Sequence, residues 1–289
     1  MQIQLRCGVR ISLLTLMFIL SSSTAVNAES EAIRFGIMSV ASPSRVYLKW
    51  QAFVAYVSRE LGQPIEIVVP YGFEKMGKAV ANGEVDFFYI NSHVFYLLKK
   101  DKKARAILQM QNIDGKVTSK SKIFVRSDSG INNVQQLKGK KIAFVSPVGA
   151  GGYLAPRAYL YNQGIETKKD SREVFTKNMT TSIHKVLLGD VAAGAMCGLN
   201  FRLMKKKIDT GELKTIAISG EYPENVIAVR TPIDTEQVKR FQKVILAMPD
   251  SVSGRQILKN MYSMKIKRFV AYDESIEKIT QKLLEQGQF

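Results

Sequence analysis

Short hydrophobic runs alternate along the chain with segments in which apolar residues recur every three or four positions. The recurrence is clearest in residues 46–61, where Val46, Trp50 and Phe53 share one helical face and Gly62 then ends the segment. Regular alternation of strands and helices predicts an α/β protein with mixed, mostly parallel sheets. Eight hydrophobic runs have the length expected of strands: residues 33–38, 65–69, 85–90, 123–125, 141–145, 193–197, 214–218 and 226–229.

Two polar stretches, residues 114–122 and 220–225, separate the middle of the chain from its two ends, and a hydrophobic strand follows each. This pattern predicts two lobes joined by two crossing hinge segments. We expect residues 29–117 and 223–289, with the C-terminal helices, to form the first lobe and residues 118–222 the second. Ligands of such folds bind beyond the carboxyl ends of the strands, so the cleft between the lobes is the expected site.

The first 28 residues have the features of a signal peptide. Arg6 and Arg10 supply a basic start, residues 11–20 form an apolar run too short to span a bilayer comfortably, and small residues precede the cleavage point. The prediction is a soluble exported protein, located in the periplasm, that begins at Glu29. Because Cys7 precedes the apolar run and no cysteine stands at the cleavage point, we do not expect a lipoprotein anchor.

Charge and cysteine content narrow the function classes. The net charge of +17 falls to +15 once the two signal-peptide arginines are removed, and a basic excess favours anionic partners. The lysines are dispersed without the interleaved aromatic residues that stack on bases, so no nucleic acid partner is expected. Cys197 remains as a buried thiol without an internal disulfide partner. The two histidines, His93 and His184, lack metal-ligand spacing, so neither a metal nor another cofactor is expected.

Residues 142–160 have the pattern of a hydrophobic strand that runs through a glycine-rich turn into a helix. The first N–H groups of a helix have no partner inside it, and they lie at the positive end of its dipole. Without side chains at Gly149, Gly151 and Gly152, an anion could approach these N–H groups closely. Glycines also serve to close tight corners, so the turn alone is a weak signal.

Asn91, Ser92 and His93 end the hydrophobic strand at residues 85–90, at the carboxyl edge where such folds bind ligands. All three side chains offer hydrogen-bond donors to an oxyanion. The alternative is a strand-to-helix cap, in which Asn91 or Ser92 satisfies the first helix N–H groups. The two roles are compatible.

Short motifs spread over nearly the whole predicted mature chain resemble one family, the periplasmic binding proteins of phosphate, phosphite and phosphonate ABC transporters. The resemblance implies a type II periplasmic binding fold. It also implies a monomer that closes two lobes on a small anionic or polar ligand and presents it to an inner-membrane ABC permease. The motifs are Phe35-Gly36, Leu61-Gly62-Gln63-Pro64, Tyr71, Gly83-Glu84-Val85-Asp86, Leu137-Lys138-Gly139-Lys140-Lys141-Ile142, Pro147, Gly152-Tyr153-Leu154-Ala155-Pro156, Ser182-Ile183, Val186-Leu187 and Gly189-Asp190-Val191.

The binding positions that the resemblance implies depart from the family pattern. The usual Asp-Pro-x-Ser-Thr-Ser loop has Ser146 in place of the Asp and Gly149, Ala150 and Gly151 in place of the three hydroxyl residues. A hydrogen bond to a charged group is worth roughly 1.5–3 kcal/mol, so these losses argue against phosphonate itself more than against binding. Because glycines leave room, we expect a larger, less charged or carboxylate ligand, held by backbone N–H groups that include Gly152. The ligand itself is not identified.

A second motif of the family, Gly-Ser-His-Asp, is present here as Lys177-Asn178-Met179-Thr180. Met179 therefore stands where the family has a ligand-contacting histidine, and packing or helix capping is the alternative role for these residues. Tyr47 and Tyr71 lie where the resemblance implies cleft tyrosines, and ordinary packing is again the alternative.

The leading hypothesis is a solute-binding protein for an ABC transporter. The alternative is a periplasmic ligand sensor that feeds a membrane signalling receptor, suggested by the missing phosphonate donors. An enzyme is not expected, because catalysis needs a positioned nucleophile and base and the named cleft positions offer only His93 as a base.

Overall fold

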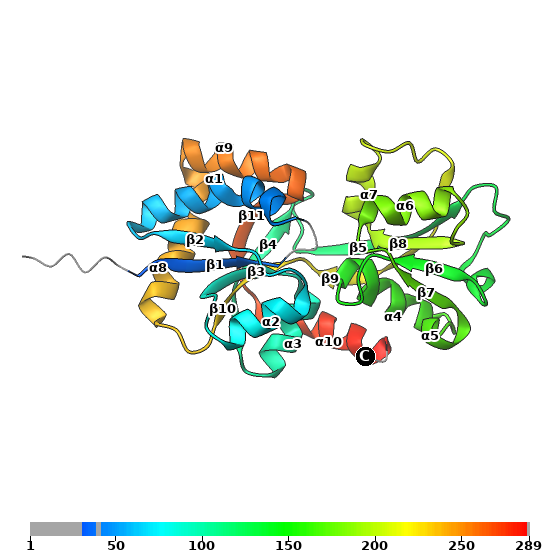
Figure 1. The fold of residues 1–289 in the computed structure, drawn as a ribbon, viewed down its shortest axis with the longest axis horizontal. Coiled ribbons are helices and arrows are strands. Elements are labelled where there is room, and N and C mark those ends of the chain that lie inside the picture. The colour runs from blue at the N-terminus through cyan, green and yellow to red at the C-terminus, as the bar shows by residue number, and fades with distance from the viewer. Residues whose placement is uncertain (1–30, 39–41, 288–289) are drawn as a thin grey trace, which may run out of the picture. The chain divides into compact units, whose positions relative to one another are not determined.

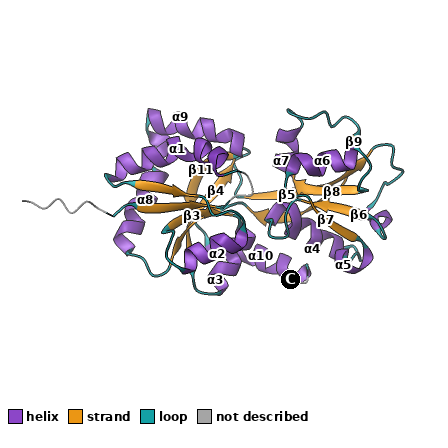
Figure 2. Cartoon of the chain, viewed as in Figure 1, coloured by secondary structure: helices purple, strands orange, loops and turns teal. Residues whose placement is uncertain are grey.

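The structure is a computed structural model. It describes residues 31–38 and 42–287, so the predicted signal peptide, residues 1–28, lies outside the described residues. Residues 31–289 form one compact unit. Within this unit the strands form two separate sheets, each flanked by helices on both faces (Figures 1 and 2).

The first lobe is built on a six-stranded sheet in the order β11-β4-β10-β3-β1-β2. β1 pairs in parallel with β2 and β3, whereas β10 and β11 run antiparallel to their neighbours. Helices α1, α8 and α9 pack on one face, and α2 and α3 on the other. The bounds are β1 Ile33–Ile37, α1 Pro43–Leu61, β2 Ile65–Val68, α2 Phe73–Ala81, β3 Phe87–Ile90, α3 Ser92–Lys100, β4 Ala104–Asn112, β10 Val226–Arg230, α8 Thr235–Leu246, α9 Val252–Asn260 and β11 Ile266–Ala271.

The second lobe is built on a five-stranded sheet in the order β7-β6-β8-β5-β9. β6 pairs in parallel with β7 and β8, and β5 runs antiparallel to β8 and β9. The bounds are β5 Thr118–Arg126, β6 Lys141–Phe144, α4 Ala155–Asn162, α5 Thr167–Asp170, β7 Arg172–Phe175, α6 Met179–Leu187, β8 Ala193–Cys197, α7 Gly198–Met204 and β9 Leu213–Pro223. The short helical turns are η1 Val134–Leu137, η2 Ala150–Leu154, η3 Met248–Asp250, η4 Met261–Met264 and η5 Glu274–Ile276.

The chain crosses between the sheets twice, from β4 to β5 and from β9 to β10. The predicted α/β class, the mixed sheets and the two crossing segments are therefore confirmed. The sheets are not mostly parallel, however, because among the described strands four pairs are parallel and five are antiparallel. Three strands had no counterpart in the sequence prediction: β4, β7 and β11. Among the described residues, no helix is both long enough and apolar enough to cross a membrane.

The C-terminal helix α10, Glu277–Gln286, contacts both lobes, although the sequence placed the C-terminal helices with the first lobe alone (Figure 1). Lys99 of α3 forms an ion pair with Glu277 at 2.8 Å. Leu283 packs in one apolar cluster with Leu154 and Ala158 of the second lobe. The helix thus bridges the first lobe, to which β11 connects it, and the second lobe.

Asp86, from the Gly83-Glu84-Val85-Asp86 motif, links three strands of the first sheet. Its carboxylate accepts hydrogen bonds from the backbone N–H, Nε and Nη2 of Arg34 at 2.9, 3.0 and 2.9 Å, and from Nε of Arg230 at 3.0 Å. Burial alone would raise the pKa of Asp86, but these hydrogen bonds outweigh it and hold the pKa below its usual value. The carboxylate is therefore ionised and structural.

Asp86→Asn should destabilise the fold by about 2–3 kcal/mol, because it removes the charge that both guanidinium groups contact. The exposed carboxylate of Glu84, two residues away, supplies the matched control. Urea unfolding at neutral pH measures both variants. Equal stabilities for Asp86→Asn and Glu84→Gln would contradict a structural role for Asp86.

His93 of α3 is also buried, with 3% of its surface exposed. Burial disfavours the charged imidazolium and lowers its pKa from 6.5 to about 4. Below pH 6.5 the unfolded chain binds this proton while the folded chain does not, so stability falls as the pH drops towards 4.

His93→Gln should remove about 3 kcal/mol of the stability difference between neutral pH and about pH 4. His184→Gln gives the control, because the His184 side chain is exposed. Denaturant unfolding across this pH range is the measurement. A profile that His93→Gln leaves as steep as that of the wild type would show that the pKa of His93 is the same in the folded and unfolded states.

Candidate ligand-binding site

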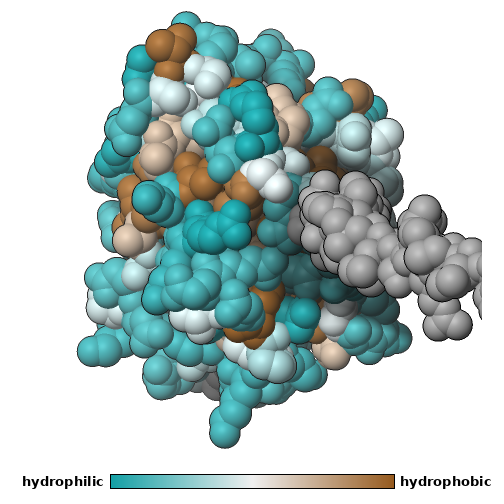
Figure 3. All heavy atoms as spheres, turned by 90° about the vertical axis from the view of Figure 1, so that its left-hand side faces the viewer, coloured by the Kyte–Doolittle hydropathy of each residue, from teal (hydrophilic) through white to brown (hydrophobic). Residues whose placement is uncertain are grey.

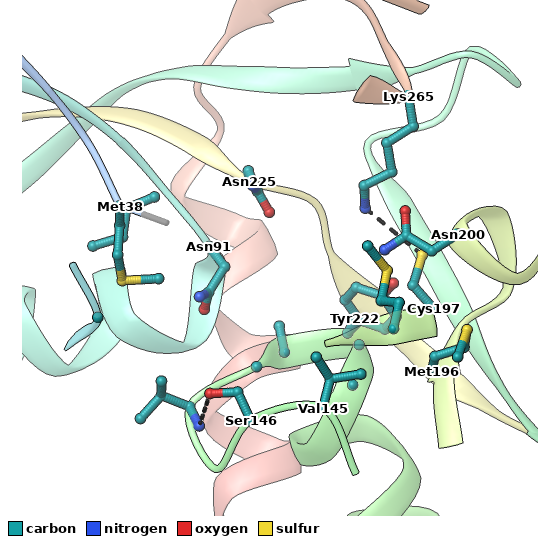
Figure 4. A pocket seen from close by; sticks show the side chains of 18 residues that line it. Met38, Asn91, Val145, Ser146, Met196, Cys197, Asn200, Tyr222, Asn225 and Lys265 are labelled. Atoms are coloured by element: carbon teal, nitrogen blue, oxygen red, sulfur yellow. Dashed lines mark hydrogen bonds between the residues drawn. The ribbon is translucent and has the colours of Figure 1, made fainter. Parts of the chain in front are cut away.

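A cavity of about 330 Å³ lies between the two lobes, beyond the carboxyl ends of β1, β3 and β6 (Figure 4). Residues at or just after the ends of these strands line it, together with residues from β8, β9, the second crossing segment and the residue before β11. Seven of the residues expected from the sequence line it: Asn91, Ser146, Gly149, Ala150, Gly151, Gly152 and Met179.

The loop after β6 supplies the glycine-rich wall of the cavity. Val148 N donates to Ser146 Oγ at 3.4 Å and Gly149 N donates to Ser146 O at 3.1 Å, which closes a tight turn. The chain then enters the π-helical turn η2, in which Tyr153 N and Leu154 N both donate to Gly149 O. The backbone N–H groups of Ala150, Gly151 and Gly152, which precede Tyr153, have no partner inside the helix. All three residues line the cavity. The turn therefore presents unused donors and the positive end of a helix to the cavity.

Tyr222 explains why residue 151 is a glycine. A Cβ atom on Gly151 would lie 2.2 Å from Tyr222 Oη, and the Gly151 carbonyl accepts a 2.6 Å hydrogen bond from Ser121 Oγ. The expectation that the glycines leave room for a larger ligand is wrong at this position, because the tyrosine ring fills the space. At Gly149 the nearest atom to an added Cβ would be Ser146 O at 3.4 Å, so room remains there.

The Tyr222 hydroxyl is itself a candidate donor. Its side chain is buried and lines the cavity, and within the described part of the chain Oη makes no hydrogen bond of acceptable distance and angle. Burial raises the pKa of Tyr222 well above its usual value, so the phenol keeps its proton. Cys197 and Ser119 lie close enough to affect the pKa of Tyr222, but a neutral O–H without a well-formed hydrogen bond can donate to a bound ligand.

Three asparagines add amide groups to the lining: Asn91, Asn200 and Asn225 (Figure 4). Asn91 caps α3, since its Oδ1 accepts a hydrogen bond from Val94 N at 3.1 Å. The cap uses the oxygen and leaves the Nδ2 amino group as a donor. The sequence indicated Asn91 through its place at a strand end, whereas nothing in the local pattern singled out Asn200 or Asn225.

Most of the remaining lining is apolar and rich in sulfur. Met179, at the position of the family's histidine, faces the same cavity as two further methionines and three aliphatic residues. These residues are Met38, Met196, Ile90, Val145 and Val148. Such walls suit a ligand with an apolar body.

Lys265 is the one charged side chain among the described residues that line the cavity. It extends into the cavity from the residue before β11 (Figure 4). Its Nζ lies 2.7 Å from Glu224 Oε2 and 3.6 Å from Cys197 Sγ. No periodicity or motif indicated Lys265, because its place in the cavity depends on contacts distant in sequence.

Six expected site residues do not line this cavity. Tyr47 and Tyr71 are about half exposed, at 51% and 50%. Ser92 Oγ donates to Pro223 O at 2.8 Å, and His93 is buried beside a different cavity that Gln281 and Leu284 of α10 also line. The other two lie at the start of α6, where Asn178 Oδ1 caps the helix by accepting from Thr180 N at 2.8 Å.

No group of three or more His, Cys, Asp or Glu residues that could hold a metal ion occurs in the described part of the chain.

The known proteins that are similar to this chain include a sensor kinase and two solved structures. The tetrathionate sensor histidine kinase TtrS of Salmonella typhimurium is 28% identical over 145 residues, which are 49% of this chain and 24% of that protein. The chain thus spans about a quarter of the kinase's length. A Xanthomonas citri protein solved with bound chloride matches with a TM-score of 0.79 at 20% identity, covering 89% of this chain and 97% of that one.

PhnD1 from Prochlorococcus marinus, solved with methylphosphonate, matches with a TM-score of 0.76 at 18% identity, covering 88% of this chain and 97% of that one. At such identities the structural matches establish the fold alone. The family of periplasmic substrate-binding proteins of phosphonate ABC transporters matches over residues 35–275. The chain therefore belongs to this family of periplasmic substrate-binding proteins of phosphonate ABC transporters.

Proposed function

We propose that the interlobe cavity binds a small anionic or polar solute. The observation that carries the proposal is the N-terminus of the helix after β6, whose glycine-rich turn presents unused N–H groups to a cavity shared by both lobes. The Asn91 amide and the Tyr222 hydroxyl supply further donors from outside this turn. Together these groups could replace part of the hydrogen bonding that the missing hydroxyl residues provide in the family.

The two crossing segments, between β4 and β5 and between β9 and β10, would act as the hinge. We propose lobe boundaries near residues 117 and 222 and closure of the two lobes on the ligand. The closed form would then dock on an inner-membrane ABC permease. The protein would reach the periplasm through its signal peptide and act there as a monomer.

Neither catalysis nor nucleic acid binding belongs to this proposal. His93, the base named from the sequence, lies outside the cavity. On the end face of the first lobe, hydrophilic residues cover most of the surface and hydrophobic residues gather in small patches (Figure 3). Such a surface fits the dispersed lysines of the sequence.

A second candidate is ligand sensing for a membrane receptor. The match to a tetrathionate sensor kinase favours this candidate, because a segment similar to this chain is part of that kinase. Tetrathionate is therefore included among the ligands to be tested.

A true ligand should both stabilise the protein and compact it. At a concentration one hundred times Kd, binding adds about 2.7 kcal/mol to the free energy of unfolding. We would screen methylphosphonate, phosphite, alkylsulfonates, carboxylates and tetrathionate by thermal shift, and then measure the radius of gyration of each complex by small-angle scattering. Stabilisation without compaction would contradict closure, and neither effect with any compound would contradict solute binding.

Gly149→Asp should abolish anion binding without unfolding the protein. Residue 149 is the N-cap of the turn, with φ of −83° that any residue can adopt. A carboxylate there would satisfy the helix N–H groups and repel an anion, whereas Gly149→Asn has the same shape and capping ability without the charge. We expect an affinity at least about tenfold lower for the Asp variant than for the Asn variant by calorimetry. Equal affinities would mean that the anion does not lie at this turn.

A further inference from the structure

The charge of the cavity rests on one buried ion pair. Lys265 supplies the sole formal positive charge among the described lining residues, and its side chain is 12% exposed. Its partner Glu224, in the second crossing segment, has a side chain that is 0% exposed and lies behind the cavity wall. Solvent and salt screen charges that are dispersed over the surface, but they screen an ion pair this deeply buried much less.

Glu224 is held firmly enough to stay ionised. Besides the 2.7 Å contact from Lys265 Nζ, its Oε1 accepts hydrogen bonds from Asn112 Nδ2 at 3.1 Å and from Ser119 Oγ. Burial acts to raise the pKa of Glu224, but Lys265 and these hydrogen bonds outweigh it and lower the pKa. For Lys265, burial acts to lower the pKa, and the neighbouring Cys197 and Glu224 outweigh it in the opposite direction. Both partners are charged at neutral pH.

The two tyrosines near Lys265 Nζ add no charge. Tyr89 of β3 and Tyr222 of β9 both have pKa values raised by burial, so both phenols are neutral. Cys197 of β8 places its sulfur 3.6 Å from Lys265 Nζ, where it accepts a hydrogen bond. The pair as a whole is neutral, and an anion in the cavity meets an ammonium whose charge a carboxylate 2.7 Å away already balances.

We propose that the cavity selects a singly charged oxyanion carried on an apolar body and discriminates against doubly charged anions. This inference rests on the proposed function and specifies the ligand class of the same site. The helix N-terminus provides about half a positive charge, and the balanced ammonium provides a donor but little net charge. A single negative charge is matched by these two features, whereas a second one would lose its water without a counter-charge. The methionine and aliphatic walls would hold the apolar body.

Propanesulfonate and propylphosphonate make a matched pair of probes. Both place a tetrahedral oxyanion on the same chain, but the sulfonate is singly charged throughout, while the phosphonate changes from one charge to two around neutral pH. Calorimetry of the wild type at about pH 5.5 and about pH 8.5 therefore varies the charge of the phosphonate, while the sulfonate reports any effect of pH on the protein itself. We expect constant affinity for the sulfonate and a loss of about tenfold for the phosphonate at the higher pH.

Variants of the ion pair test whether the pair sets this selectivity. Glu224→Gln leaves Lys265 unbalanced, so propylphosphonate at about pH 8.5 should bind about tenfold more tightly relative to propanesulfonate than in the wild type. Lys265→Met should weaken both probes. The double variant, Glu224→Gln with Lys265→Met, is neutral again and should return the ratio of the two affinities to the wild-type value. If the ion pair had only a structural role, these variants would change the stability of the protein without changing the ratio of the two affinities.

Each result has a separate meaning. If the doubly charged phosphonate binds the wild type more tightly than the sulfonate does, the charge selection is wrong while solute binding stands. If the ratio of affinities does not respond to Glu224→Gln, the ion pair does not set it. If Glu224→Gln fails to fold, the wild-type pH series still tests the charge selection, and Lys265→Met, which leaves the charge of Glu224 unbalanced, still tests the ion pair. If neither probe nor any compound of the wider panel binds, solute binding itself has failed.

Discussion

The buried ion pair between Lys265 and Glu224 lies where the structural elements of the cleft converge. Glu224 belongs to the crossing segment between β9 and β10, and it accepts hydrogen bonds from Asn112 at the end of β4 and from Ser119 in β5. Both crossing segments are thereby tied to each other and, through Lys265, to the start of β11. A pair so buried is stable only while every lone pair and proton is satisfied. The same set of contacts therefore ties the two crossing segments together and balances the charge of Lys265 in the cavity.

Tyr222 and Gly151 show how the loss of the family's hydroxyl residues can be accommodated. The third hydroxyl position of the loop is a glycine, and the ring of Tyr222 occupies the space where a side chain would begin. The ring brings a hydroxyl into the cavity lining from β9 in place of one from the loop. A donor supplied by a rigid, buried ring differs in position and reach from a serine or threonine hydroxyl. The cavity is therefore altered in geometry as well as in the number of its donors.

The fold was largely predictable from the sequence, because hydrophobic runs and helical spacing are local signals. The three missed strands show the limit of those signals. In β4 the apolar residues are interrupted by Arg105, Gln109 and Gln111, and β11 carries Lys267 and Arg268 beside its buried positions. β7 has four residues, none of them fully buried. Such strands are stabilised by pairing with neighbours that are distant in sequence, which local periodicity does not report.

The site was predictable only where a local motif carried it. The glycine-rich turn and Asn91 follow strand ends, a position that a single sequence reveals, and both line the cavity. Asn200, the pair Tyr222 and Asn225, and Lys265 come from three separate places in the last third of the chain, and none is distinguished by its neighbours in sequence. Their convergence is a product of the two crossing segments, which bring β9, β10 and β11 back beside the loop after β6. The donors and the charge that come from outside the loop after β6 thus lie in residues that only the folded arrangement brings together.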